Sequence, residues 1–600
     1  MKRIKQFIMA GMLAGFGGSL LSCTDLTETV YDQVMSQNYY QSKQDIINAV
    51  FRPMEHIYSC SWIRYEMEEE PADQVITPVR GNWYVDGGRW GMLHRHQYDD
   101  ITMDEWTREW ENYYAGIGQC NLVLDDLSKL SPGKFEMTDR EFDELRGQLR
   151  CARAFCYLRL INVYRNCVLT TTSDQAVNER PENRKQVAPE VLFGFIESEL
   201  LDCLNALPGK SGQGGNRAQQ GTWTKASAAA LLARLYLNAQ VWIGEPKWQE
   251  CINICERIMG GEFGYYEIAK NWYEPFDWNN EECDEVIYGF PGSYGTSSWH
   301  LQNDLRTVYG RNLPYGCQYY LGIEGNGDRN PKFALTPSYD NQVPRQLFTH
   351  KLGMVSQKFK KYSDLGDDLR FKQYKNLSVN TREGMFFLEG YIPGRGDDPN
   401  GKRVYAQNPD KQYNLYLRDQ VGSFENGAPQ GIIANSARSE SIMENGDFNS
   451  GLCCVKYPLY SFTGGYYIES DYTEIRLAEV VYSAAECYLR LGNARKAGTL
   501  LNSVRKRNYT NWSALIAYQD ENNTGNIVLD LEEMLDEWGR EFLVESRRRT
   551  DLIRFGRFQE AWWDKPADLD KHYELYPIPR TALEQNSYLK QNPGYPDIER

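Results

Sequence analysis

The residues best suited to chemistry in this chain are aromatic side chains that stand beside planar polar groups. Residues 80–84 read Arg-Gly-Asn-Trp-Tyr, which places two rings next to a guanidinium and an amide, and a further Trp follows six residues later. A flat ring stacks on the C–H face of a sugar or packs against a peptide side chain, while Arg and Asn hydrogen-bond to polar groups. The alternative for each ring is that it packs inside the protein and contacts no ligand. The ligand contacts predicted in this segment are Arg80, Asn82, Trp83, Tyr84 and Trp90.

A second group of aromatic residues occurs in the long stretch 261–472, which is rich in Gly, Pro, Asn and Asp and has little helical periodicity. An irregular stretch of this length inside a compact protein is usually functional. Rings again stand beside polar residues there, as where Trp299 precedes His300 and Gln302. The ligand contacts predicted in this second stretch are Tyr294, Trp299, Tyr315 and Tyr320.

Signals for catalysis or for a bound metal are weak. The sequence contains no H-E-x-x-H or G-x-S-x-G motif and no phosphate-binding loop. His94 and His96 are two residues apart, which favours a hydrogen-bonding pair in a loop over a metal site. Acidic loops around Asp328 and at 364–368 lack the EF-hand spacing, so no cofactor is expected and structural calcium is the weaker alternative.

Composition excludes some classes of partner. The formal net charge is −16 over 600 residues, which argues against nucleic acid and against an anionic membrane face as binding partners. None of the 14 cysteines forms a C-x-x-C pair, and most lie on the faces of expected helices. They are therefore predicted to be small buried hydrophobes, not a zinc site or a disulfide framework.

The elements that would position these residues are amphipathic helices. Apolar residues recur every three or four positions in six segments, and this period predicts a helix in each. The segments are 145–163, 192–207, 224–237, 248–258, 477–491 and 494–504.

Two of the expected helix pairs share one design. Residues 226–260 and 474–508 each span about 35 residues with small alanines on the first helix, which is typical of a tetratricopeptide repeat. About 210 residues separate the two pairs. We therefore expect a helical solenoid that is assembled from distant parts of the chain.

Charged residues near the C-terminus follow a helical spacing. Separations of three and four residues permit ion pairs along one helix, each worth about 0.2–0.5 kcal/mol. We expect this cluster to fix the last helix and the proline-rich tail against the scaffold, not to catalyse a reaction. Its members are Arg540, Glu541, Glu545, Arg548, Asp551 and Arg554.

The first 22 residues have the pattern of an export signal. Three basic residues lie within the first five positions, and an apolar stretch follows that is too short and too rich in Gly to span a membrane. The stretch ends in Leu-Leu-Ser before Cys23, which is typical of a bacterial lipobox. Cys23 is therefore the predicted lipidation site, and its acyl chains would hold the protein on a membrane.

The C-terminal motifs resemble those of a known family. Residues 576–579 read Tyr-Pro-Ile-Pro, residues 591–595 read Gln-Asn-Pro-Gly-Tyr, and residues 540–545 read Arg-Glu-Phe-Leu-Val-Glu. Together they resemble the C-terminal signature of the SusD/RagB family, whose members are nutrient-binding surface lipoproteins of Bacteroidetes-type bacteria. One departure is Ser546, which stands where the family motif usually has Gly.

The resemblance implies a mainly α-helical, SusD-like fold in which helix pairs of tetratricopeptide-repeat type support a large irregular ligand-binding region. It implies one domain over residues 23–600, with the scaffold at about 36–260 and 473–560 and the loop-rich insert at about 261–472. It also implies an outer-membrane protein, anchored by lipid at the cell surface. Such a protein binds oligosaccharides without catalysis and delivers them to a SusC-like TonB-dependent transporter.

Three alternatives remain open from the sequence. The same architecture could capture peptides, as in RagB-like members of the family. A lipid-anchored glycan hydrolase is a second reading, although no motif supports it. A third is a scaffold that binds proteins through its helical repeats, as tetratricopeptide repeats often do.

Overall fold

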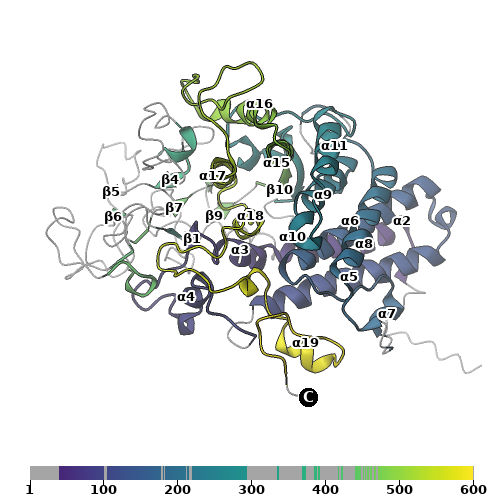
Figure 1. Ribbon diagram of the computed structural model, residues 1–600. Coiled ribbons are helices and arrows are strands. Elements are labelled where there is room, and N and C mark those ends of the chain that lie inside the picture. The colour runs from purple at the N-terminus through teal and green to yellow at the C-terminus, as the bar shows by residue number, and fades with distance from the viewer. Residues whose placement is uncertain are drawn as a thin grey trace, which may run out of the picture.

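The computed structural model describes residues 39–100, 105–177, 183–210, 221–292 and 470–598, together with short pieces between residues 334 and 467 and a few single residues. Within these residues the protein is mainly α-helical, as predicted (Figure 1). The helices before residue 260 are α2 (Lys43–Ser59), α3 (Ser61–Glu69), α4 (Arg89–His94), α5 (Glu105–Lys129), α6 (Asp139–Val163), α7 (Ser173–Val177), α8 (Pro189–Ala206), α9 (Lys225–Leu237), α10 (Ala239–Ile243) and α11 (Trp248–Met259). The later ones are α15 (Leu477–Arg490), α16 (Ala494–Arg505), α17 (Leu531–Glu541), α18 (Arg548–Arg554) and α19 (Arg580–Gln585).

The helices pack as a row in which each contacts the next. α2 packs on α5, which packs on α6, and the row continues through α8, α9 and α11 to α15 and α16. The contact between α11 and α15 joins the two helix pairs that lie far apart in the sequence, which confirms the expected assembly from distant parts. Figure 1 shows α5, α6, α8, α9 and α11 gathered on one side of the molecule, with the short strands β1 (Val75–Ile76), β4 (Phe386–Phe387) and β7 (Cys453–Cys454) on the other.

Local sequence explains where α2 and α6 begin. Ser42 caps α2 by accepting a hydrogen bond from the backbone N–H of Asp45, whose carboxylate accepts one in return. Thr138 and Glu141 form the same reciprocal box at the start of α6. Each box satisfies two backbone donors that the first turn of a helix leaves unpaired.

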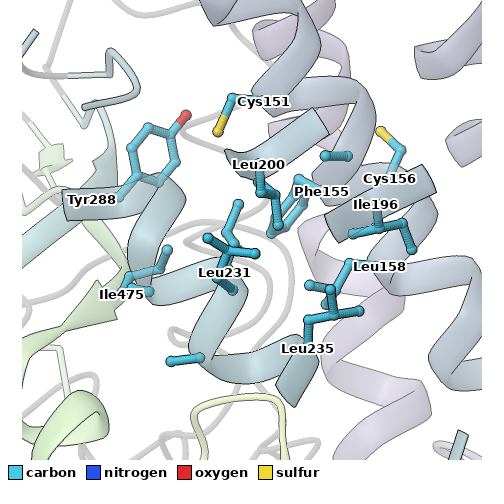
Figure 2. Close-up of a cluster of buried hydrophobic side chains, with 14 of the residues drawn as sticks. Cys151, Phe155, Cys156, Leu158, Ile196, Leu200, Leu231, Leu235, Tyr288 and Ile475 are labelled. Carbon is cyan, nitrogen blue, oxygen red and sulfur yellow. The ribbon is translucent and has the colours of Figure 1, made fainter. Parts of the chain in front are cut away.

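One hydrophobic core joins the helical row to the strands that carry Tyr288 and Ile475 (Figure 2). In that view Phe155 and Leu158 of α6 lie against Leu231 and Leu235 of α9, with Ile475 beyond them. The described cysteines are free and nearly all buried within the helical packing, which confirms their role as small hydrophobes.

The strands are short and pair two by two. They are β1 (Val75–Ile76), β2 (Val286–Phe290), β3 (Ala334–Leu335), β4 (Phe386–Phe387), β5 (Gly390–Tyr391), β6 (Tyr416–Leu417), β7 (Cys453–Cys454), β8 (Tyr460–Phe462), β9 (Gly465–Tyr467) and β10 (Tyr472–Arg476). β2 pairs antiparallel with β10, with Tyr472 opposite Phe290 and Arg476 opposite Val286. Both strands are fully buried, so β2, which lies inside the irregular stretch, is part of the core.

The charged cluster near the C-terminus is buried except at Glu545, and within it only Asp551 and Arg554 (2.7 Å) pair along one helix as predicted. Glu541 accepts hydrogen bonds from Arg370 (2.8 Å), Arg476 (2.8 Å) and Arg507 (2.7 Å). These side chains are almost fully buried, and they come from four separate segments. Burial alone would raise the pKa of Glu541, but the three guanidinium groups hold it far below its ordinary value.

A second buried carboxylate extends this network. Glu537, one turn before Glu541, pairs with Arg540 (2.7 Å), Arg505 (3.2 Å) and Arg370 (3.5 Å). The attraction of the guanidinium groups outweighs burial and lowers the pKa of Glu537 to about 2. Removing one partner of such a buried pair costs about 3–5 kcal/mol, which is far more than an exposed pair along a helix contributes.

The expected single helix is broken between residues 541 and 548. Val544 and Ser546 have φ angles of 56° and 57°, which lie in the left-handed region that side chains disfavour. Lys456 satisfies the end of α17 by donating to the carbonyl groups of Glu541 and Leu543, each at 3.0 Å. The left-handed backbone at Ser546 gives a physical reason for the Gly that the family motif usually has there.

The proline-rich tail is fixed against the scaffold through contacts of its own side chains. Tyr576 and Ile578 are fully buried, and the Tyr576 hydroxyl donates to the carbonyl of Met67 at 2.7 Å. The Asn592 amide donates to the carbonyl groups of Tyr164 (3.0 Å) and Tyr576 (2.7 Å). The end of the chain therefore closes over α3 and the end of α6.

We expect Glu541→Gln to lower the free energy of unfolding by about 3–5 kcal/mol, because it leaves three buried guanidinium groups without their shared carboxylate. Urea unfolding followed by circular dichroism measures this change. The control is Glu144→Gln, which removes the carboxylate of the exposed pair with Arg140 and should cost about 1 kcal/mol or less. Equal effects of the two substitutions would contradict the role given to the buried network.

Candidate functional site

A tight turn presents the first group of predicted ligand contacts. Arg80 and Trp83 exchange two backbone hydrogen bonds of 3.0 and 3.1 Å, so the chain reverses between them. Gly81, at the first position inside the turn, has a φ angle of 63° that suits glycine. The side chains of Asn82 and Trp83 therefore stand at the tip of a short, closed loop.

Trp83 and Asn82 are exposed at this tip. Trp83 keeps 49% of its surface accessible, which is unusual for so large an apolar side chain, and Asn82 beside it is also exposed. Tyr84 is half-buried and packs against a small apolar cluster. An exposed ring with an adjacent amide is the arrangement that a stacking site requires, so the prediction for these three residues stands as made.

Arg80 and Trp90 lie beneath the surface, which argues against their predicted role as direct ligand contacts. Arg80 is fully buried, and its guanidinium donates to the Ser450 carbonyl at 2.8 Å. Trp90 is 3% exposed, and its indole N–H donates to the Asp86 carboxylate at 2.8 Å. These two side chains are buried because they pack beneath the turn and hold it against the rest of the protein.

The loop after the turn has a strained backbone. Tyr84 and Asp86 have φ angles of 58° and 32°, and Gly87 and Gly88 follow with 66° and 82°. A left-handed backbone costs a non-glycine residue about 1–2 kcal/mol, and such positions gather at functional sites. Trp90 offsets this strain by packing with the second apolar cluster, formed by Ile76, Ala334, Val421, Met443 and Trp563.

The sequence missed two features of this loop. Val85 is 49% exposed next to the Trp83 and Tyr84 pair, so it widens the apolar surface at the tip. Asp86 fixes the Trp90 indole instead of facing a ligand. The Asp-Gly-Gly sequence at 86–88 signals a turn, but it does not tell which way the neighbouring side chains point.

His94 and His96 form hydrogen bonds inside the protein. His94 Nε2 lies 2.8 Å from the carbonyl of Trp563, and His96 lies between the Pro71 carbonyl (2.8 Å) and the Asp568 carboxylate (2.7 Å). Burial lowers the pKa of His96 to about 4 despite the nearby carboxylate. The preferred reading of the pair, hydrogen bonding and not metal binding, fits these contacts.

Several predicted residues lie outside the described residues. They are Tyr294, Trp299, Tyr315 and Tyr320, the export signal at 1–22, Cys23, Asp328, and residues 364–367. Asp368 is described, and it pairs with Arg370 at 2.7 Å. Across the described ranges, no group of three or more His, Cys, Asp or Glu side chains is arranged to hold a metal ion. Within the same ranges, no helix has the length and apolar character that a membrane crossing requires.

Comparison with known proteins shows which family this chain is similar to. A model of the SusD family matches residues 397–595, and a model described as starch-binding and associating with the outer membrane matches residues 28–237. The starch-binding protein SusD of Bacteroides thetaiotaomicron is 24% identical over 529 residues, which cover 84% of this chain and 83% of that protein. The chain belongs to the SusD-like family.

Solved structures of SusD-like proteins share the fold. A SusD homologue from Bacteroides thetaiotaomicron superposes with a TM-score of 0.62 at 17% identity, covering 93% of this chain and 98% of the other. A laminarin-binding SusD-like protein gives 0.57 at 18% identity, covering 93% of this chain and all of the other.

We expect Trp83→Ala and Trp90→Ala to affect stability very differently. Trp83 is half-exposed, so its loss should change the free energy of unfolding by about 0.5 kcal/mol or less. Trp90 is buried in a cluster, so its loss should cost about 3–5 kcal/mol. Thermal and urea unfolding of the two variants measures the contrast, and a large cost at Trp83 would mean that its ring packs inside the protein.

Proposed function

We propose that this protein is a cell-surface lipoprotein that binds oligosaccharides and passes them unchanged to a SusC-like TonB-dependent transporter. The observation that carries the proposal is the exposed Trp83 with Asn82 beside it, held on a short anchored loop. The membership of the chain in a family described by starch binding supports a glycan as the ligand.

A preformed stacking surface suits capture followed by release. The Trp83 ring offers a flat apolar face for the C–H side of a sugar, and the Asn82 amide offers both a donor and an acceptor for a hydroxyl. Because the turn and its buried anchors hold the loop in place, little conformational freedom is lost on binding. A few such contacts give modest affinity, which permits transfer of the ligand to a transporter.

Binding without catalysis is the simplest chemistry for this loop. Glycoside hydrolysis uses two carboxyl groups on either side of the scissile bond. Residues 80–90 contain one carboxylate, that of Asp86, and it is engaged by the Trp90 indole at 2.8 Å. The loop therefore offers a platform for a sugar and lacks the pair of acids that cleavage would require.

The proposed binding is tested by titrating the full-length protein, purified in detergent, with maltooligosaccharides and with laminarin oligosaccharides in a calorimeter. We expect saturable binding to at least one of these glucans and no released product. Trp83→Ala should weaken that binding by about tenfold or more, because exposed tryptophans at binding surfaces contribute strongly.

Trp512 provides a matched control for this experiment. It is a second exposed tryptophan, 37% accessible, in the segment that follows α16. Trp512→Ala should leave glucan affinity unchanged within error. Equal losses at Trp83 and Trp512 would remove the loop from the site, and cleavage of the oligosaccharide would contradict the transfer function.

The membrane anchor is tested separately. We expect Cys23→Ser to abolish incorporation of labelled palmitate and to move the protein from the membrane fraction to the soluble fraction, because acyl chains supply the membrane affinity. Membrane fractionation of cells that express each form measures this. Ser22→Ala, which keeps the thiol and a small residue before it, should leave both properties intact. Persistent membrane attachment of the Cys23→Ser form would overturn the lipid anchor.

A further inference from the structure

A cavity of about 90 Å³ lies where the helical row meets the C-terminal helices. Its walls come from α3, α6, α9, α10, β10, α15, α18 and the turn between α17 and α18. No residue of the 80–90 loop lines it, so it is separate from the proposed glycan platform. A single water needs about 10–15 Å³ of such space, so the cavity has room for roughly six to nine waters or for a small ligand of that size.

The charged groups at the cavity balance one another. Among the described residues, four arginines and four glutamates line it. Glu474 lies between Arg64 and Arg234 (2.7 Å), and Glu479 lies between Arg234 (2.6 Å) and Arg547 (3.3 Å). The other two glutamates are also paired with arginines. An ion that entered the cavity would bring a charge without a counter-charge, so the lining favours a neutral ligand.

Two uncharged polar groups at the cavity lack partners. The Trp242 indole N–H and the Asn162 amide oxygen form no hydrogen bond among the described residues, although these residues line the cavity and are only 4% and 7% exposed. The Asn162 amide nitrogen donates to Glu68 (2.9 Å) and to Thr550 (2.8 Å). Because a carboxylate only accepts hydrogen bonds, Glu68 fixes the orientation of the amide and leaves its oxygen as the unpaired atom.

Both unpaired atoms keep surface that a ligand can reach. The interior also holds polar atoms that have no partner and almost no accessible surface, such as the indole nitrogens of Trp106 and Trp223. Trp242 Nε1 and Asn162 Oδ1 are not sealed in this way. Buried polar groups in folded proteins are nearly always hydrogen-bonded, so a donor and an acceptor left open on one cavity indicate that a group from outside the chain completes them.

The rest of the accessible wall is apolar. Phe155, Leu158 and Phe542 line the cavity, and each is at most 9% exposed. Phe155 and Leu158 are among the side chains of α6 that Figure 2 shows. A ligand that fits this cavity therefore carries carbon for the apolar wall, one acceptor for the indole N–H and one donor for the amide oxygen.

We propose that this cavity binds a small neutral polyol of the size of glycerol or erythritol. One hydroxyl oxygen would accept a hydrogen bond from Trp242 Nε1, and another hydroxyl would donate to Asn162 Oδ1. The carbon chain would pack against Phe155 and Leu158. Hydroxyl groups suit both positions because each can donate and accept. This site is separate from the glycan platform and does not rest on the proposed function.

Ligand-observed NMR of the full-length protein, purified in a detergent without a sugar headgroup, tests the proposal with erythritol as the titrant. We expect a saturable saturation-transfer signal that glycerol competes away. Glucose should not displace erythritol, because it is too large for the cavity. Propionate and ethylammonium should not displace it either, because each brings an unpaired charge.

A matched pair of variants tests the role of the indole N–H. Trp242→Phe keeps an aromatic ring and removes the donor, so it should weaken erythritol binding by about fivefold to tenfold. Trp223→Phe removes an indole N–H that is sealed inside the protein and should leave the affinity unchanged. Equal losses in the two variants would show that the effect is one of packing and would overturn the proposal.

A second variant decides the case if Trp242→Phe does not fold. Leu158→Phe narrows the apolar side of the cavity and leaves every polar group in place. It should weaken erythritol more than glycerol, whereas Trp83→Ala should affect neither. The absence of a saturable erythritol signal with the wild-type protein would overturn the proposal. Displacement of erythritol by propionate or by ethylammonium would show a site for an ion and would also overturn it.

Discussion

Glu541 accepts hydrogen bonds from three guanidinium groups that come from three separate segments of the chain, and all four side chains are buried. A buried ion without its partner strongly destabilises a protein. The folded structure therefore requires all the segments that carry these groups to pack together. This requirement fixes the positions of Arg370, Arg476 and Arg507 relative to α17. Glu541 thereby links α17 to the irregular stretch, to β10 and to the second helix pair.

The surrounding structure also holds the proposed glycan platform in place. At the glycan platform, left-handed backbone at Tyr84 and Asp86 is held because Arg80 and Trp90 anchor the loop below its surface. Strained backbone persists where the surrounding structure over-determines it, and this loop follows that rule.

The helices were predictable because their apolar residues repeat with the period of an α-helix, and this signal is local. Helices α6, α8, α9, α11, α15 and α16 lie where the pattern indicated. The single helix expected through residues 540–554 is not formed, and the spacing of the charged residues does not show why. Val544 and Ser546 adopt left-handed backbone, which is stabilised by the contacts of Lys456 with the end of α17. Likewise, Trp83 and Trp90 have the same chemistry in the sequence, and one is exposed while the other is buried.

The amino-acid sequence by itself determined the helical segments, the acidic balance and the family motifs, because these depend on composition or on residues that are near one another in the chain. Tertiary structure decided which rings reach the surface and which charges are buried. These properties depend on partners such as Ser450 for Arg80 and Glu474 for Arg64, which lie hundreds of residues away. A sequence pattern cannot predict such a contact, because the contact forms only when the distant segments pack together.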